Sequence, residues 1–274
     1  RELCKSGHKV LVQNDAGTSI GLDNAEYQKA GAELVATPEE IFKRSDMIVK
    51  VKEPQLNECK MLREDQILFT YLHLAPDPEQ AQGLIKSGAH AIAYETVTDE
   101  RNRLPLLAPM SEVAGRMSIQ AGAHYLEKTY GGRGVLLSGV PVVNAGNVVV
   151  LGGGVVGTNA AKVAIGMGAH VTVIERSNER MKELDMFFGA SINTVYATDY
   201  AIEKYALEAD LVIGAVLVPG AAAPRLITRE MIGQMKKGSV LVDVSIDQGG
   251  CFETSKATTH ADPVYTIDGV IRSE

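Results

Sequence analysis

The stretch from Asn147 to Arg176 constrains the fold of this chain more than any other. It opens with an unbroken apolar run, Val148 to Leu151, which predicts a strand buried on both faces of a parallel sheet. A G-x-G-x-x-G pattern, an alanine-rich helical pattern and a second apolar strand follow in that order. The glycines of the pattern are Gly152, Gly154 and Gly157. The second strand ends at Glu175, 18 positions after the last of them, close to the spacing of the dinucleotide fingerprint.

The chemistry of a dinucleotide explains this arrangement. A pyrophosphate has to lie against the backbone amides at the start of a helix, where the helix dipole is positive. A β-carbon at Gly152 or Gly154 would hold the pyrophosphate off, and one at Gly157 would push the helix away from the strand. Glu175 can accept hydrogen bonds from both ribose hydroxyls and repels a 2′-phosphate, which favours NAD over NADP. The alternative is a glycine-rich turn that serves close packing only.

Composition excludes several other classes of function. The chain has a net charge of −7, no tryptophan and no basic run, which makes it a poor nucleic-acid binder. No apolar run reaches the length of a membrane helix. Three widely spaced cysteines form no disulfide framework and no metal site, which fits a cytoplasmic protein. The sequence opens without methionine, on what reads as the last turns of a helix, so we expect a fragment of a longer chain.

The remaining pattern predicts an α/β protein of two α/β domains. Strands and short helices alternate through the first hundred residues, which indicates a parallel-sheet substrate domain over residues 1–105. A polar loop separates it from a doubly wound Rossmann domain for NAD over residues 106–274, which opens with a long linking helix over 110–129. The six strands expected in this second domain end with Val264 to Ile267.

Three polar residues stand at the ends of predicted strands, where ligands of open parallel sheets bind. Lys52 ends the strand predicted over 46–52, His73 the strand over 66–73, and Asp247 follows the strand over 239–246. Hydride transfer to or from a 2-oxo or 2-amino acid needs a cation, a group that moves protons near neutral pH and a further polar group. Each residue also has an ordinary interpretation: a solvated lysine, a structural histidine and a turn aspartate. The residues alone therefore indicate an NAD-linked enzyme with its substrate between two α/β domains.

Longer motifs make the interpretation more specific, because the chain resembles bacterial alanine dehydrogenases from its start to about residue 265. The segments that carry the resemblance are KVKEP (50–54), FTYLHLA (69–75), LLAPMSEVAGR (106–116), GGRGVL (131–136), AVLVPG (215–220) and DVSIDQGGCFE (243–253). The NAD-binding subunit of proton-translocating transhydrogenase is similar too, but PMSEVAGR and IDQGGCFE look like the dehydrogenase branch.

The resemblance implies reversible, NAD-dependent conversion of L-alanine to pyruvate and ammonium. It implies that Lys52 binds the substrate, that His73 is the acid/base group at the substrate oxygen, and that Asp247 is the second proton-transfer residue. It also implies a homo-oligomer, a hexamer. The sequence singles out no metal ligands, and the expected location is the cytoplasm. Beyond the three glycines, the implied cofactor contacts are Ser111, Glu175, Arg180, Val216, Leu217, Val244, Ser245, Ile246, Asp247 and, as a weaker match, Lys256.

The sequence departs from the family pattern at both ends. It lacks the first strand with the arginine that grips the substrate carboxylate, and it stops where the family continues into further helices. From Ile271 onward it looks unrelated. Two other hypotheses therefore stay open: a truncated NAD-binding polypeptide without catalysis, and a transhydrogenase-type NAD-binding module, which would show no dependence on alanine.

Overall fold

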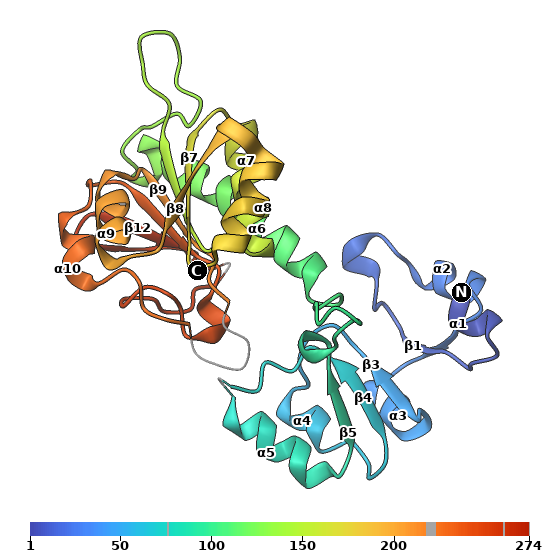
Figure 1. Ribbon diagram of the computed structural model, residues 1–274. Coiled ribbons are helices and arrows are strands. Elements are labelled where there is room, and N and C mark those ends of the chain that lie inside the picture. Colours follow the sequence, from blue (N-terminus) through green and yellow to red (C-terminus); the bar gives the residue numbers. More distant parts are fainter. Residues whose placement is uncertain (76, 218–222, 260, 274) are drawn as a thin grey trace. The chain divides into compact units, whose positions relative to one another are not determined.

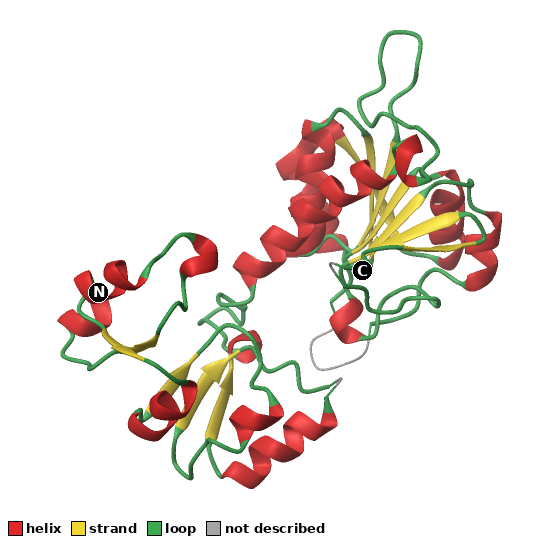
Figure 2. Cartoon of the chain, turned by 180° about the vertical axis from the view of Figure 1, so that it is seen from behind, coloured by secondary structure: helices red, strands yellow, loops and turns green. Residues whose placement is uncertain are grey.

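The computed structural model describes residues 1–75, 77–217, 223–259 and 261–273 (Figure 1). The chain divides into two compact units, Arg1–Leu106 and Leu107–Glu274, and each is described by itself. Figure 2 shows their helices and strands from behind. Within the described ranges, no helix is long and apolar enough to cross a membrane.

The first unit alternates short strands and helices, and its strands pair in parallel. Its helices are α1 (Glu2–Lys5), α2 (Asn24–Lys29), α3 (Pro38–Arg44), α4 (Leu56–Cys59) and α5 (Pro78–Ser87), with 3-10 turns η1 (Thr18–Ile20) and η2 (Tyr94–Thr96). Its strands are β1 (Leu11–Gln13), β2 (Glu33–Val35), β3 (Met47–Val49), β4 (Ile67–Thr70) and β5 (His90–Ala93). One sheet holds β1 and β2, and the other has the order β3-β4-β5. The carboxyl ends of β3, β4 and β5 therefore lie along one edge.

Local signals and one apolar cluster account for this unit. Helix α5, for example, starts where the Asp77 carboxylate accepts the N–H of Gln80 at 2.9 Å, and it ends at Gly88, whose φ of 70° suits a left-handed cap. Phe42 of α3 and Leu84 of α5 are buried in the same cluster as apolar residues of the sheet.

The second unit is built on a seven-stranded sheet. Its helices are α6 (Ala108–Tyr125), α7 (Val155–Gly166), α8 (Asn178–Phe188), α9 (Asp199–Glu208) and α10 (Arg229–Gln234), with 3-10 turns η3 (Lys128–Tyr130), η4 (Gly189–Ser191) and η5 (Ile246–Gln248). Its strands are β6 (Asn147–Leu151), β7 (His170–Glu175), β8 (Ile192–Tyr196), β9 (Leu211–Gly214), β10 (Val240–Asp243), β11 (Tyr265–Ile267) and β12 (Val270–Ser273). The order is β11-β12-β10-β9-β6-β7-β8, and all pairs are parallel except β11 with β12. This confirms the predicted doubly wound α/β fold.

Strand β6 shows how the sheet is covered on both faces. Val148 and Val150 belong to the cluster that includes residues of α6, α7 and α8, whereas Val149 and Leu151 belong to the cluster with α9 and α10. Side chains of a strand alternate between the two faces, so a continuous apolar run is what a strand between two helical layers requires.

The sixth parallel strand is not the segment that we expected. Residues 264–267 were predicted to fill this place, but β11 is an antiparallel edge strand and β12 pairs with β10 instead. The turn between them is Asp268-Gly269, and both residues have positive φ, 51° and 82°. These angles match a two-residue hairpin turn of type I′. Residues 271–273, which the sequence pattern had set apart, therefore form part of the sheet.

Helix α6 spans 108–125 rather than the predicted 110–129. Pro109 is accepted in its first turn, where a proline costs no hydrogen bond. The helix ends early because the segment 131–134 folds back over its last turn. The N–H of Gly134 donates to the carbonyl of Leu126 at 2.8 Å, and a β-carbon on Gly132 would lie 2.3 Å from the carbonyl oxygen of Tyr125.

The loop before β6 contains a strained valine. Val140 and Val143 bond to each other through both backbone pairs, which makes Pro141 and Val142 the central residues of a turn. Val142 has a φ of 70° and a fully exposed side chain. The second central position of a type II turn normally holds glycine, because a branched β-carbon is strained at positive φ.

We therefore expect Val142→Gly to stabilise the second unit. Removing the strain at this exposed turn should raise the free energy of unfolding by about 1 kcal/mol, after the larger unfolded-state entropy of glycine is subtracted. Thermal unfolding followed by circular dichroism checks this. Val143→Gly is the matched control and should not stabilise, since only Val142 has a positive φ here. An equal or lower melting temperature for Val142→Gly contradicts the strain argument.

Candidate functional site

The edge of the first unit's sheet gathers the polar residues that follow β3, β4 and β5. Lys52 and Glu53 follow β3, His73 follows β4, and Glu95 lies in η2 directly after β5. The predicted strands over 46–52 and 66–73 are wrong in length, since β3 ends at Val49 and β4 at Thr70. The residues selected as strand ends therefore stand on irregular backbone just beyond the sheet.

His73 is held in this position by contacts to both neighbouring segments. Its φ is 45°, and its N–H donates to the Glu95 carboxylate at 2.8 Å, beside that of Leu72 at 3.0 Å. The imidazole Nδ1 lies 3.4 Å from a carboxylate oxygen of Glu53. The ring also stacks on Tyr71, with 5.8 Å between centroids and 9° between planes.

The two lysines of β3's end have different surroundings. Lys50 Nζ lies 2.5 Å from the Glu58 carboxylate in a largely covered ion pair. The side chain of Lys52 is exposed, while its carbonyl accepts the Thr70 hydroxyl at 2.9 Å. Of the two, Lys52 is the lysine that a soluble carboxylate can reach.

The glycine turn joins β6 to α7 in the second unit. Gly152 has a φ of 95°, and a β-carbon there would lie 2.7 Å from the carbonyl oxygen of Ala215. A β-carbon at Gly157 would lie 1.8 Å from the Gly152 oxygen. Gly154, by contrast, has no atom within 4 Å of that place and forms the N-cap of α7 without a side chain to cap it. The start of this twelve-residue helix therefore suits an anion.

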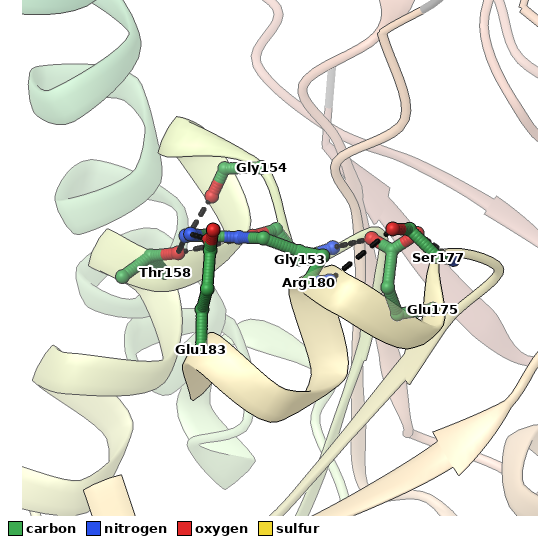
Figure 3. Close-up of polar contacts among 7 residues, drawn as sticks. All are labelled: Gly153, Gly154, Thr158, Glu175, Ser177, Arg180 and Glu183. Carbon is green, nitrogen blue, oxygen red and sulfur yellow. Dashed lines mark hydrogen bonds and ion pairs between the residues drawn. The ribbon is translucent and has the colours of Figure 1, made fainter. Parts of the chain in front are cut away.

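Charged side chains bind both the N–H and the carbonyl of Gly153 (Figure 3). The Glu175 carboxylate accepts the Gly153 N–H at 2.7 Å and also the N–H groups of Arg176 and Ser177. The Arg180 Nε donates to the Gly153 carbonyl at 2.7 Å. A further Arg180 nitrogen donates to Thr158, and the guanidinium is ion-paired with Glu183. Glu175 and Arg180, both predicted cofactor contacts, thus also organise the turn.

The ends of β9 and β10 lie beside this turn. The carbonyl of Val216 accepts the Ser245 hydroxyl at 2.8 Å, and a β-carbon on Gly152 would lie 3.3 Å from Val216 Cα. Leu217 is exposed next to it. The structure therefore brings together the predicted cofactor contacts that directly follow β6, β9 and β10 in the second unit.

The buried carboxylate of Asp243 organises the segment that carries Asp247. It accepts the N–H groups of Ser245 at 2.9 Å and Cys251 at 2.8 Å, and the Ser255 hydroxyl at 2.5 Å. These bonds bend the chain after β10, so the predicted strand over 239–246 ends early, at residue 243. Burial raises the pKa of the Cys251 thiol, which keeps it in the protonated form that can donate to Asp243. Asp247 itself is exposed in η5.

Two predicted cofactor residues lie on other segments. Ser111 is in the first turns of α6, four residues before Gly115, where a β-carbon would lie 2.2 Å from the Val156 carbonyl oxygen. Ser111 lies one turn before Gly115 on the same face of α6, and it is Gly115 that packs against the start of α7. Lys256 places its ammonium 4.4 Å from the centre of the Tyr265 ring. In the described part of the chain, no cluster of three acidic, histidine or cysteine side chains could hold a metal.

Reasoning from sequence missed Glu53, Glu95 and Asp243. A signal was present for two of them, since Glu53 and Glu95 follow strands just as Lys52 and His73 do, and the strand-end rule selects them equally. Asp243 reads as an interior strand residue, and only the folded segment after β10 shows that its carboxylate accepts several bonds.

Comparisons with known proteins find relatives over nearly the whole chain. The family model described as alanine dehydrogenase/PNT, N-terminal domain, matches residues 1–114, and that of the C-terminal domain matches residues 118–272. The alanine dehydrogenase of Halomonas elongata is 56% identical over 271 residues, which cover 99% of this chain and 73% of that protein. A solved L-alanine dehydrogenase is 48% identical with a TM-score of 0.92, over 99% of this chain and 75% of that one. The transhydrogenase from Sinorhizobium meliloti is 25% identical with a TM-score of 0.83, over 99% and 78% of the two chains.

Proposed function

The chain belongs to the alanine dehydrogenase/PNT family, and on this premise we propose that it catalyses the NAD-dependent oxidative deamination of L-alanine to pyruvate and ammonium, and the reverse reaction. The observation that carries the proposal is the 56% identity with an alanine dehydrogenase over nearly the whole chain. The 25% identity with a transhydrogenase is much lower. The chain is accordingly an amino-acid oxidoreductase that uses a nicotinamide cofactor.

The second unit fits such a cofactor. The uncovered N-cap at Gly154 and the positive φ of Gly152 leave room for a pyrophosphate against the first amides of α7. Glu175 stands at the end of β7, where a carboxylate can receive ribose hydroxyls. When bound, the nicotinamide supplies the hydride acceptor for oxidation and the donor for reduction. We propose NAD rather than NADP because Glu175 would repel a 2′-phosphate.

The proposed roles follow from what each side chain can do. Lys52 holds the substrate carboxylate by its positive charge. The substrate ammonium first loses a proton, so that departure of the α-hydrogen as hydride leaves an iminium. Water then adds to the iminium carbon and loses a proton, which gives a carbinolamine. His73 removes the proton from the carbinolamine oxygen as the carbonyl forms and ammonia leaves, and Asp247 assists the proton transfers at nitrogen. In the reverse direction the same groups return these protons.

A spectrophotometric assay tests the proposal directly. The purified chain, mixed with NAD and L-alanine at alkaline pH, should give a growing NADH absorbance that depends on both reactants. A folded chain that binds NAD but gives no alanine-dependent signal would favour the non-catalytic hypothesis. Hydride transfer between two nicotinamide nucleotides without alanine would favour the transhydrogenase-type module. The hexameric homo-oligomer and the cytoplasmic location stay predictions.

The preference for NAD should depend on Glu175. We expect Glu175→Gln to weaken NAD binding about 10- to 30-fold, because hydrogen bonds to a charged group contribute about 2 kcal/mol. NADP binding should improve relative to NAD, because the repulsion of its 2′-phosphate is lost. Fluorescence titration with both nucleotides measures the ratio. Glu179→Gln, an exposed change of the same charge in the first turn of α8, is the control. An unchanged ratio of NAD to NADP affinity in Glu175→Gln contradicts the role of Glu175.

A further inference from the structure

Contacts within the protein fix the backbone of His73. A φ of 45° is unusual for a residue other than glycine and persists only where the surroundings impose it. Here the carboxylate of Glu95, which lies directly after β5, accepts two successive N–H groups, those of Leu72 and His73. Glu95 thereby fixes the direction in which the His73 side chain leaves the chain.

The imidazole ring is fixed by a separate set of contacts. Tyr71 covers one face of it, and Tyr71 is anchored because its hydroxyl donates to the Leu106 carbonyl at 2.6 Å. Glu53 faces Nδ1 at 3.4 Å. Both side chains of this pair are about one-third exposed, at 29% for His73 and 33% for Glu53. One edge of the ring therefore meets a carboxylate.

The chemistry of the carboxylate decides which ring nitrogen carries the proton. Burial alone would raise the pKa of Glu53, but its backbone N–H, the hydrogen bond with His73 and the charge of Lys52 outweigh burial and lower that pKa. Glu53 is thus ionised near neutral pH, and an ionised carboxylate can only accept hydrogen bonds. Nδ1 must be the donor, which leaves the lone pair of the neutral imidazole on Nε2.

We propose that Glu53 is a positioning residue that holds His73 as the Nδ1–H tautomer, so that Nε2 is the atom that exchanges a proton with the substrate. This inference rests on the proposed acid/base role of His73. It assigns the two carboxylates different tasks: Glu95 orients the main chain of His73, and Glu53 orients its ring and selects its tautomer. Neither carboxylate needs to touch the substrate for this.

The tautomer can be measured without any enzymatic activity. Long-range proton–nitrogen correlation spectra of the full chain with nitrogen-labelled histidine, recorded at alkaline pH, distinguish protonated from unprotonated ring nitrogens. The His73 signals are identified by their absence in His73→Asn. We expect the proton on Nδ1 in the natural chain. In Glu53→Gln the tautomers should mix, since the amide no longer imposes one of them. A proton on Nε2 in the natural chain overturns the proposal, even if Glu53→Gln does not fold.

Steady-state kinetics of alanine oxidation provide a second, independent test of the role of Glu53. Glu53→Gln should lower kcat about 10- to 100-fold, the loss seen when the carboxylate partner of a metal-ligating histidine is removed. The KM for alanine and the affinity for NAD should change little, because Glu53 is proposed to contact neither. Glu64→Gln, which removes the same charge from an exposed side chain before β4, should leave kcat and tautomer unchanged. If the natural chain turns over alanine and Glu53→Gln keeps its kcat, the inference fails while the proposed function stands. If the chain is inactive, the function fails and the spectra still decide the tautomer.

Discussion

His73→Asn is expected to lower kcat for alanine oxidation about 100- to 10,000-fold, the range that loss of a general acid/base group produces. Asparagine suits this test because it is among the few residues that tolerate a φ near 45°, so the backbone held by Glu95 should survive. With alanine at this position, a loss of rate could come from backbone strain as well as from the missing imidazole. NADH formation under saturating alanine and NAD measures the loss.

The binding of NAD should be untouched by this substitution, because the predicted cofactor contacts all lie in the second unit. His90→Gln is the matched control: His90 is the first residue of β5, largely exposed, and should be replaceable without loss of rate. A His73→Asn variant that keeps more than about a tenth of the rate is not compatible with an acid/base role.

Two glycine substitutions at the junction of β6 and α7 should affect different properties. Gly157→Ala forces a β-carbon to within 1.8 Å of the Gly152 carbonyl oxygen and 3.1 Å of Val150, so helix and strand must separate. We expect a loss of about 3 kcal/mol of stability, a typical upper value for overpacking. For a unit of this size that lowers the melting temperature by about 6 to 12 °C.

Gly154→Ala should leave the melting temperature nearly unchanged and weaken NAD binding at least about tenfold. The place of its β-carbon is open in the structure, and its φ of −66° is allowed for alanine. The new methyl group would stand where a pyrophosphate approaches the amides of α7. Differential scanning calorimetry and NAD titration of both variants separate the two effects. Equal NAD affinity for Gly154→Ala and the natural chain contradicts the proposed phosphate position, and an unchanged melting temperature for Gly157→Ala contradicts the packing argument.

The α/β class and the doubly wound order were predictable because their signals are local. The apolar run of β6, the glycine turn and the acidic end of β7 lie within 30 residues, and each has a direct physical cause in the folded unit. The hairpin at Asp268-Gly269 was equally visible, since this dipeptide is a strong hairpin signal. The expectation of a sixth parallel strand over 264–267 did not use this signal.

The ends of the strands were not predictable, because distant side chains determine them. The sequence pattern predicts that the strand continues through Leu72 and His73. In the structure their N–H groups donate to the carboxylate of Glu95, 22 or 23 positions away, and not to a neighbouring strand. The orientation of the His73 ring depends in the same way on Glu53, 20 positions earlier. The periodicity of apolar residues predicts only local structure along the chain. The contacts of Glu53 and Glu95 with His73 form only when β3, β4 and β5 lie side by side.

Glu175 accepts the N–H of Gly153, and Arg180 donates to its carbonyl. These two hydrogen bonds affect the conformational entropy that the turn loses when it binds a nucleotide. A glycine loop that fluctuated freely would lose conformational entropy on each encounter, and affinity would fall accordingly. Here contacts within the protein already order the backbone of Gly153, so the turn is preorganised. The same contacts set up a competition, since the carboxylate that receives a ribose must share its oxygens with three backbone amides.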